Sequence, residues 1–159
     1  MTEECSTKAP CENPYCMRCK PPARWVGIVG TRRRNTGTDY NLVREAYLNI
    51  QRSGDAIVSG GCPEGGDHFA EIIASRFLGG RIKIHWPDNS KLDPNLPRRA
   101  AYAKICYARN TLIADDADVL IACVASDRKG GTEDTITKFC KKHDSTERYL
   151  IAEGLLILV

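Results

Sequence analysis

Short apolar runs alternate along the chain with longer segments in which apolar residues recur at helical spacing. The short runs are rich in β-branched and aliphatic residues, which favours buried strands. They cover residues 25–29, 56–58, 82–84, 118–124, 149–152 and 155–159. The longer segments place their apolar residues on one helical face and cover residues 40–52, 68–77, 98–115 and 132–142. The pattern therefore predicts alternating strands and helices.

This alternation predicts βαβ units, and such units build a mostly parallel sheet with helices on both of its faces. We expect one Rossmann-like α/β domain over residues 23–159, because the 159 residues contain neither a repeat nor a second domain. Residues 1–22 are rich in cysteine and proline and are expected to form a separate segment. Thr38 or Asp39 is expected to cap the first helix, and Thr132 the last.

The composition is typical of a soluble, globular protein, with 27% charged residues, 42% hydrophobic residues and a formal net charge of +3. This mild positive charge allows a small anionic ligand and does not favour bulk nucleic-acid binding. No apolar run approaches the roughly 20 residues of a membrane span. The first residues lack the basic and apolar regions of a signal peptide. We therefore expect a cytoplasmic protein without membrane contact.

The eight cysteines fall into two groups. One group lies among the predicted strands and helices, where buried thiols are ordinary: Cys62, Cys106, Cys123 and Cys140. The other group lies in the N-terminal segment: Cys5, Cys11, Cys16 and Cys19. Cys16 and Cys19 have the C-x-x-C spacing with which two thiolates chelate one ion. A structural zinc knuckle is one interpretation of this segment, and a disordered leader is the other.

Glycine and arginine gather directly after three of the predicted strands. The segments are Gly30-Thr31-Arg32-Arg33-Arg34, the stretch SGGCPEGGD at 59–67, and residues 126–132, which include Arg128 and Lys129. The carboxyl ends of parallel strands share one edge of a sheet, where ligands bind. Helix N-termini expose unpaired amides, and glycine lets an anion approach the backbone closely. These loops predict a crevice for a phosphorylated, anionic ligand; a tight turn and solvated arginines are the plainer interpretation.

In combination, these motifs resemble the SLOG superfamily, the Rossmann-like group that unites Smf/DprA proteins with LOG, or lysine decarboxylase-like, proteins. The resemblance covers about residues 24–143, looks closest to the YspA-like branch, and rests on Gly30-Thr31-Arg32, Gly60-Gly61, Gly65-Gly66-Asp67, Ala70, Arg109-Asn110 and Gly130-Gly131-Thr132. It implies a nucleotide or nucleotide-derived ligand across the strand ends. LOG members cleave the N-glycosidic bond of nucleoside monophosphates, other SLOG domains sense nucleotides, and DprA binds single-stranded DNA.

Glycosidic hydrolysis needs a carboxylate near the oxocarbenium-like transition state and a cation for the phosphate or the base. The candidates for this chemistry are Asp67, Arg109 and Glu133. The candidates for ligand binding are Gly30, Thr31, Arg32, Ser59, Gly60, Gly61, Gly65, Gly66, Asn110, Gly130, Gly131 and Thr132. Structural alternatives stand beside two of them: Asp67 as an N-cap and Arg109 paired with Asp115 or Asp116. Asn110 is expected to orient the loop after the fourth strand by side-chain hydrogen bonds, and a local hydrogen bond within its own helix is the structural alternative.

One position departs from the LOG pattern, because Thr135 stands where the resemblance places the catalytic glutamate. Glu133 and Asp134 are acidic but face other directions on a helix. A sensor or carrier that binds a nucleotide-like ligand is therefore the favoured function. A nucleoside monophosphate N-glycosidase is the alternative, and single-stranded DNA binding is weaker, because Tyr102 and Tyr107 have a helical spacing that suits core or interface burial better than base stacking. A homo-oligomer is also expected.

Overall fold

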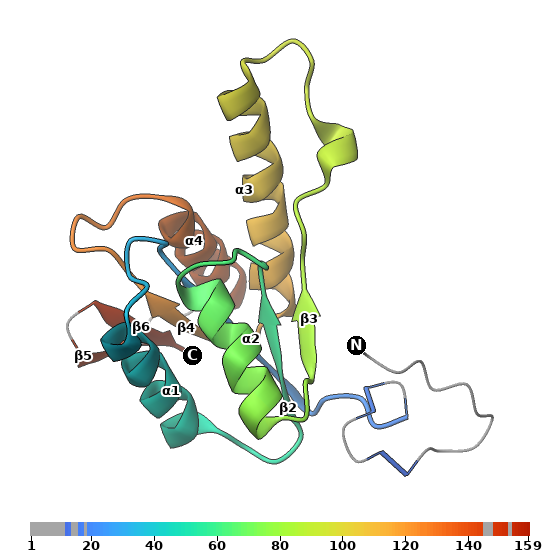
Figure 1. Cartoon of the computed structure of the whole chain (residues 1–159), viewed down its shortest axis with the longest axis vertical. Helices are drawn as coiled ribbons and strands as arrows, with labels where there is room; N and C mark the ends of the chain where they lie inside the picture. The colour runs from blue at the N-terminus through green and yellow to red at the C-terminus, as the bar shows by residue number, and fades with distance from the viewer. Residues whose placement is uncertain (1–11, 14–15, 18, 145–147, 153) are drawn as a thin grey trace.

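The computed structural model describes residues 12–13, 16–17, 19–144, 148–152 and 154–159. Strands and helices alternate over most of this part of the chain, as the apolar pattern predicts (Figure 1). The strands are β1 (Arg24–Gly30), β2 (Asp55–Ser59), β3 (Ile82–Ile84), β4 (Val119–Cys123), β5 (Arg148–Ala152) and β6 (Leu155–Leu158). The helices are α1 (Gly37–Ile50), α2 (Gly66–Phe77), the short 3-10 helix η1 (Asn89–Lys91), α3 (Arg98–Asp116) and α4 (Gly131–His143).

The strands form one sheet in the order β3-β2-β1-β4-β6-β5. β1 pairs in parallel with β2 on one side and with β4 on the other, and β3 pairs in parallel with β2. β6 and β5 close the sheet as an antiparallel hairpin beside β4. The prediction of a Rossmann-like α/β fold with a mostly parallel sheet is confirmed.

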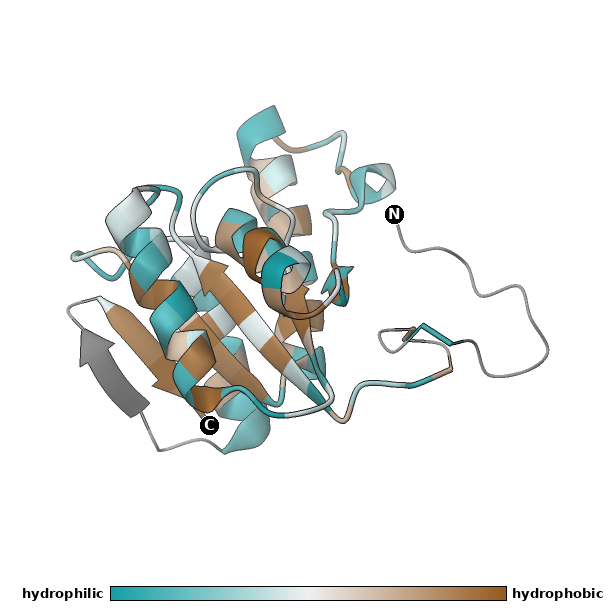
Figure 2. Cartoon of the chain, turned by 60° about the horizontal axis from the view of Figure 1, so that its bottom comes forward, coloured by the Kyte–Doolittle hydropathy of each residue, from teal (hydrophilic) through white to brown (hydrophobic). Residues whose placement is uncertain are grey.

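The helices cover the two faces of the sheet in pairs, and the core has one layer on each face. Side chains of α1 and α2 pack with one face of β1, β2 and β4, around Tyr47, Phe69 and Ile73. Side chains of α3 and α4 pack with the opposite face, around Ile113 and Phe139. Figure 2 shows the strands as mostly hydrophobic ribbons between helices of mixed character. The chain changes face after β3, so the switch point of this topology lies between β1 and β4.

The outer half of α3 projects beyond the sheet, together with the loop that leads from β3 through η1 (Figure 1). The inner half is buried at Asn110, Ile113 and Ala114. On the projecting half, Tyr102 is 51% exposed and Tyr107 is 45% exposed. The prediction that these tyrosines are buried in the core is therefore wrong. Helical spacing in the sequence does not show how far a helix extends beyond the sheet. No helix in the described part of the chain is long and apolar enough to cross a membrane.

The helices begin differently from the sequence prediction. α1 begins after Thr36, whose side chain accepts a hydrogen bond from the amide of Asp39, while the Asp39 carboxylate accepts one from the Thr36 amide. This is a reciprocal capping box. Glycines precede α2 and α4: Gly65 with φ 73° and Gly130 with φ 117°. No side chain in the described part of the chain caps α2 or α4, so Asp67 and Thr132 do not serve as N-caps.

Candidate functional site

The loops after β1 and β4 meet at the switch point, on the edge of the sheet where the parallel strands end. Arg33 reaches across from the first loop and forms an ion pair with Asp127 in the second, with 2.8 Å between nitrogen and oxygen. It also donates to the carbonyl of Lys129 at 3.1 Å. The Arg33 guanidinium lowers the pKa of Asp127 by hydrogen bonding to its carboxylate. The sequence prediction that these two loops converge is confirmed.

The consecutive arginines after β1 have three different environments. Arg34 is mostly buried, pairs with Asp39 at 2.8 Å and donates to the carbonyl of Gly154 at 2.8 Å, so it holds the loop to the β5–β6 hairpin. Arg33 is paired with Asp127. Arg32 is exposed and forms no ion pair with any described residue. Of the three, Arg32 is therefore the one whose charge has no ion-pair partner among the described residues.

A hollow of about 580 Å³ lies beside these loops. Its walls come from the ends of β1 and β4 and from the start of β6, and its lining residues are Arg33, Arg34, Val124, Ala125, Ser126, Arg128, Gly154 and Leu156. The pKa of Arg128 is raised by its hydrogen bond with Glu133. Glu133 is thus held in an ion pair with Arg128, one of the residues that line the hollow, and its catalytic role stays a prediction.

The glycines of the SGGCPEGGD turn serve first as packing positions. Gly66 at the start of α2 lies against Gly30 at the end of β1, so a Cβ added at Gly30 would come within 3.0 Å of Gly66 Cα. A Cβ added at Gly65 would come within 2.5 Å of the Thr31 carbonyl oxygen. The amide of Gly65 donates to the Asn35 side chain at 2.8 Å. The turn therefore fixes α2 directly onto the loop after β1.

Most of the candidate ligand-binding residues of this turn are covered by the protein itself. Gly60, Gly65 and Gly66 are buried, while Gly61 is partly exposed. Ser59 is fully buried, and its hydroxyl lies 2.6 Å from the carbonyl oxygen of Ile28 and 3.1 Å from Asp67 Oδ1. The prediction that Ser59 contacts a ligand directly is therefore wrong, because the surrounding protein encloses its side chain completely.

Asp67 is a buried carboxylate that holds the glycine turn closed. It is 7% exposed, and it accepts hydrogen bonds from the Ser59 hydroxyl and, at 3.1 Å, from the amide of Cys62. Burial raises its pKa above the usual value, while the Cys62 amide and the nearby Arg109 guanidinium act in the opposite direction. The Arg109 Nη1 atom lies 4.0 Å from Asp67 Oδ2.

Arg109 and Asn110 connect α3 to the two glycine loops. Arg109 donates through Nη1 to the Gly60 carbonyl and through Nε to Asn110 Oδ1 at 3.0 Å. Pairing of Arg109 with Asp115 or Asp116 is wrong, because its side chain turns inward to the sheet edge. Asn110 Nδ2 donates to the Gly131 carbonyl at 3.2 Å and to Asp134 at 3.1 Å. Asn110 therefore orients the loop after β4, as predicted.

These contacts form one polar network, which joins β2, α2, α3 and α4 through Ser59, Asp67, Arg109, Asn110 and Asp134. Sequence reasoning missed the parts of Asp134 and Asn35. The pairing of Asp134 with Lys138, four residues later, is a signal in the sequence, but it indicates only a stable helix surface.

The start of α4 remains accessible. Gly130 and Gly131 are exposed and Thr132 is partly exposed, and no side chain of the described residues caps this end. An uncapped helix N-terminus presents amide donors and a partial positive charge. Thr135, which stands where the resemblance to LOG proteins would place a glutamate, is buried and donates to the Gly131 carbonyl at 3.3 Å. Gly30 and Thr31, at the end of β1, are partly exposed.

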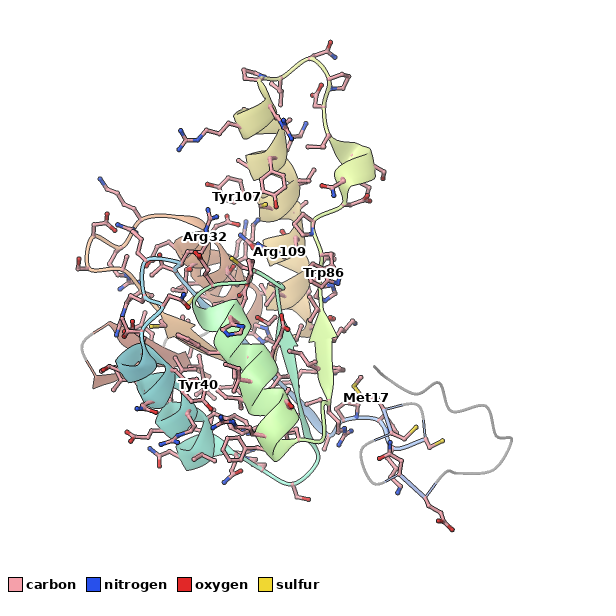
Figure 3. The ribbon with its side chains drawn as sticks, in the orientation of Figure 1. Met17, Arg32, Tyr40, Trp86, Tyr107 and Arg109 are labelled. Carbon is pink, nitrogen blue, oxygen red and sulfur yellow. The ribbon has the colours of Figure 1, made fainter. Side chains whose placement is uncertain are left out.

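A second feature that sequence reasoning missed is Trp86, just after β3. Its side chain is 64% exposed. In Figure 3, Arg32, Arg109 and Trp86 lie along the upper edge of the sheet, in the direction from β1 to β3. A tryptophan directly after an apolar run is a signal in the sequence. The strand before it is too short, however, to predict whether the ring is buried or exposed.

The N-terminal cysteines contribute no metal centre among the residues that the structure describes. Cys5 and Cys11 lie outside those residues, Cys16 is buried and Cys19 is partly buried. No group of three or more histidine, cysteine, aspartate or glutamate side chains with metal-binding geometry occurs in the described part of the chain. The zinc knuckle stays a prediction from the cysteine spacing.

Comparison with known proteins gives no match for this chain, whether with protein family models, with curated proteins or with solved structures. The site is therefore interpreted from its own geometry.

Proposed function

We propose that the chain binds a nucleotide-like phosphorylated ligand at the carboxyl ends of β1 and β4, as a sensor or carrier. The observation that carries this proposal is that two groups able to attract an anion come from the two strands beside the switch point. One is the exposed Arg32, which has no ion pair among the described residues, and the other is the uncapped start of α4 at Gly130 and Gly131. Switch points of parallel sheets are the usual ligand crevices of such folds.

The surrounding charges favour a compact anion rather than a long polyanion. Arg33 and Arg128 are already paired with Asp127 and Glu133. Arg34 is occupied by Asp39 and backbone carbonyls. Arg32 and Lys129 are left exposed in the two loops. One phosphate group fits this small surplus of charge better than a nucleic-acid backbone, which needs many cationic contacts. The ligand class agrees with that implied by the resemblance to SLOG proteins.

A second candidate is N-glycosidic cleavage of the bound nucleotide, and the environment of Asp67 is the observation that favours it. A buried carboxyl with a raised pKa beside an arginine suits a general acid. Its hydrogen bonds to Ser59 and Cys62, however, have a purely structural explanation, because they close the glycine turn. Binding without chemistry therefore remains the better-supported function.

The test is isothermal titration calorimetry with AMP and with ribose 5-phosphate. We expect both to bind, and we expect Arg32→Gln to weaken both about tenfold, which corresponds to about 1.4 kcal/mol. Arg52→Gln is the matched control, because Arg52 is also exposed but lies before β2, at the opposite edge of the sheet. Equal affinities of Arg32→Gln and Arg52→Gln, or no binding by the wild type, would contradict the proposal. Chromatography of the same samples detects free adenine, whose appearance would favour the hydrolase.

A further inference from the structure

Trp86 is a large apolar side chain that the fold holds in solvent at the end of the sheet. It is 64% exposed, yet its six-membered ring rests on the glycine turn. A Cβ added at Gly61 would come within 2.6 Å of Trp86 Cζ3 and within 2.7 Å of Ile84 Cγ2. Gly61 also has φ 72°, a conformation that favours glycine. The turn therefore leaves room for the indole ring.

The backbone before and after Trp86 is fixed, so the ring has a defined place. The amide of His85 donates to the Ser59 carbonyl at 2.9 Å, which extends the pairing of β3 with β2. The His85 ring is 2.6 Å from the Asp116 carboxylate at the end of α3. Pro87 follows and restricts Trp86 to extended backbone conformations. Trp86 is thus an exposed aromatic side chain on a well-anchored strand end.

Trp86 lies at the same edge of the sheet as the proposed phosphate site, because both follow the carboxyl ends of parallel strands. Trp86 follows β3 and Arg32 follows β1, and β2 lies between these strands. Two strand spacings amount to about 10 Å. The Arg32 and Trp86 side chains both lie along this edge (Figure 3). Gly60 follows β2 and therefore lies between Arg32 and Trp86 along the sheet edge. Arg109 reaches the same place, because it donates to the Gly60 carbonyl.

We propose that Trp86 is the base-binding residue of this site and stacks against the aromatic base of a nucleoside monophosphate whose phosphate lies near Arg32 and the start of α4. The inference rests on the proposed function, since the phosphate end orients the ligand. A stacking residue accepts any planar base, because every base has a π-face. The site therefore separates nucleotides from sugar phosphates, and it favours the larger stacking surface of purines.

The test uses the two tryptophans of the chain, Trp25 and Trp86. Trp25 lies at the opposite end of β1, where its ring faces Lys83. In a Trp25→Phe protein the fluorescence reports on Trp86 alone. We expect AMP to quench this emission and ribose 5-phosphate to leave it nearly unchanged. In the wild-type background, we expect Trp86→Leu to weaken AMP binding about 5- to 150-fold, the range of a lost base stack, and to leave the ribose 5-phosphate affinity unchanged.

The controls distinguish the base-binding role from the proposed function as a whole. Trp86→Phe retains an aromatic ring and is expected to retain most of the AMP affinity. If Trp86→Leu binds AMP and ribose 5-phosphate as the wild type does, the base-binding role is wrong and the phosphate site stands. If the wild type binds neither compound, the proposed function fails and this inference fails with it. If Trp86→Leu changes only the molecular mass measured by light scattering, Trp86 is a self-association contact and the inference is overturned.

Discussion

Replacing Asp67 by alanine tests the polar network that joins the glycine turn to α3. The substitution leaves the Cys62 amide and the Arg109 guanidinium without their carboxylate, while Ser59 keeps the Ile28 carbonyl and Arg109 keeps the Gly60 carbonyl. An unsatisfied buried donor costs about 1–3 kcal/mol. Loss of a buried charge partner costs more, but the 4.0 Å separation and the remaining carbonyl contact reduce that part. Together these effects predict a loss of about 3 kcal/mol at pH 7.

The measurement is urea denaturation followed by far-UV circular dichroism. With a slope of about 2 kcal/mol per molar urea, a loss of about 3 kcal/mol lowers the midpoint by about 1.5 M. Glu45→Ala is the control, because Glu45 is an exposed acid on α1, and surface substitutions usually change stability by less than about 0.5 kcal/mol. Equal midpoints for Asp67→Ala and Glu45→Ala would refute the reasoning from the network.

The pH dependence of the same difference has a definite sign. The pKa of Asp67 is raised on folding, so between its unfolded and folded pKa values the native state binds more protons than the unfolded state. Stability falls with rising pH wherever the native state binds more protons. The advantage of the wild type over Asp67→Ala is therefore largest below about pH 4 and shrinks as the pH rises through the folded pKa. An advantage that grows over this range would contradict the burial of this carboxyl.

Two further substitutions test the packing. Gly66→Ala would drive its methyl group into the backbone of Val29 and Gly30, whereas a Cβ added at Gly37 meets nothing within 4 Å. We therefore expect a melting temperature far below that of Gly37→Ala in thermal denaturation, and equal melting temperatures would contradict the close packing. Asp55→Ala strands the mostly buried Arg24 and is expected to cost about 3 kcal/mol in urea denaturation. Removing the half-exposed Asp115, paired with Lys142, should cost less than about 1 kcal/mol, and a reversed order would be a refutation.

The fold could be predicted from the sequence because buried positions form continuous runs in the strands and recur at helical spacing in the helices. β2 and β4 are fully buried, and their apolar residues leave a continuous run in the sequence. Helix starts were harder to predict, because α2 and α4 begin after glycines that have no capping side chain. A glycine that starts a helix through its backbone conformation has no side chain to form a capping hydrogen bond, so the sequence lacks the usual capping residue as a signal.

The site could be predicted only as far as its place in the fold. Arg32, Arg33 and Arg34 are equivalent in the sequence, and their different environments depend on Asp127 and Asp39, which other loops and helices bring close. The same limit applies to Asp67, whose place in the first turn of a helix suggested an N-cap. Its hydrogen bonds reach back to Ser59 and Cys62, and only the closed turn brings those groups within reach.

The glycine turn shows why a glycine pattern alone is weak support for a phosphate site. Gly66 is required by its contact with β1 whether or not a ligand binds, and Gly65 is required by its contact with the Thr31 carbonyl. Gly61 differs, because its missing side chain makes room for Trp86, a side chain that the fold does not need to bury. The argument for a ligand therefore rests on three features at one edge of the sheet that packing does not explain. They are an exposed aromatic ring, a helix start that no described side chain caps, and Arg32, which has no ion pair in the described part of the chain.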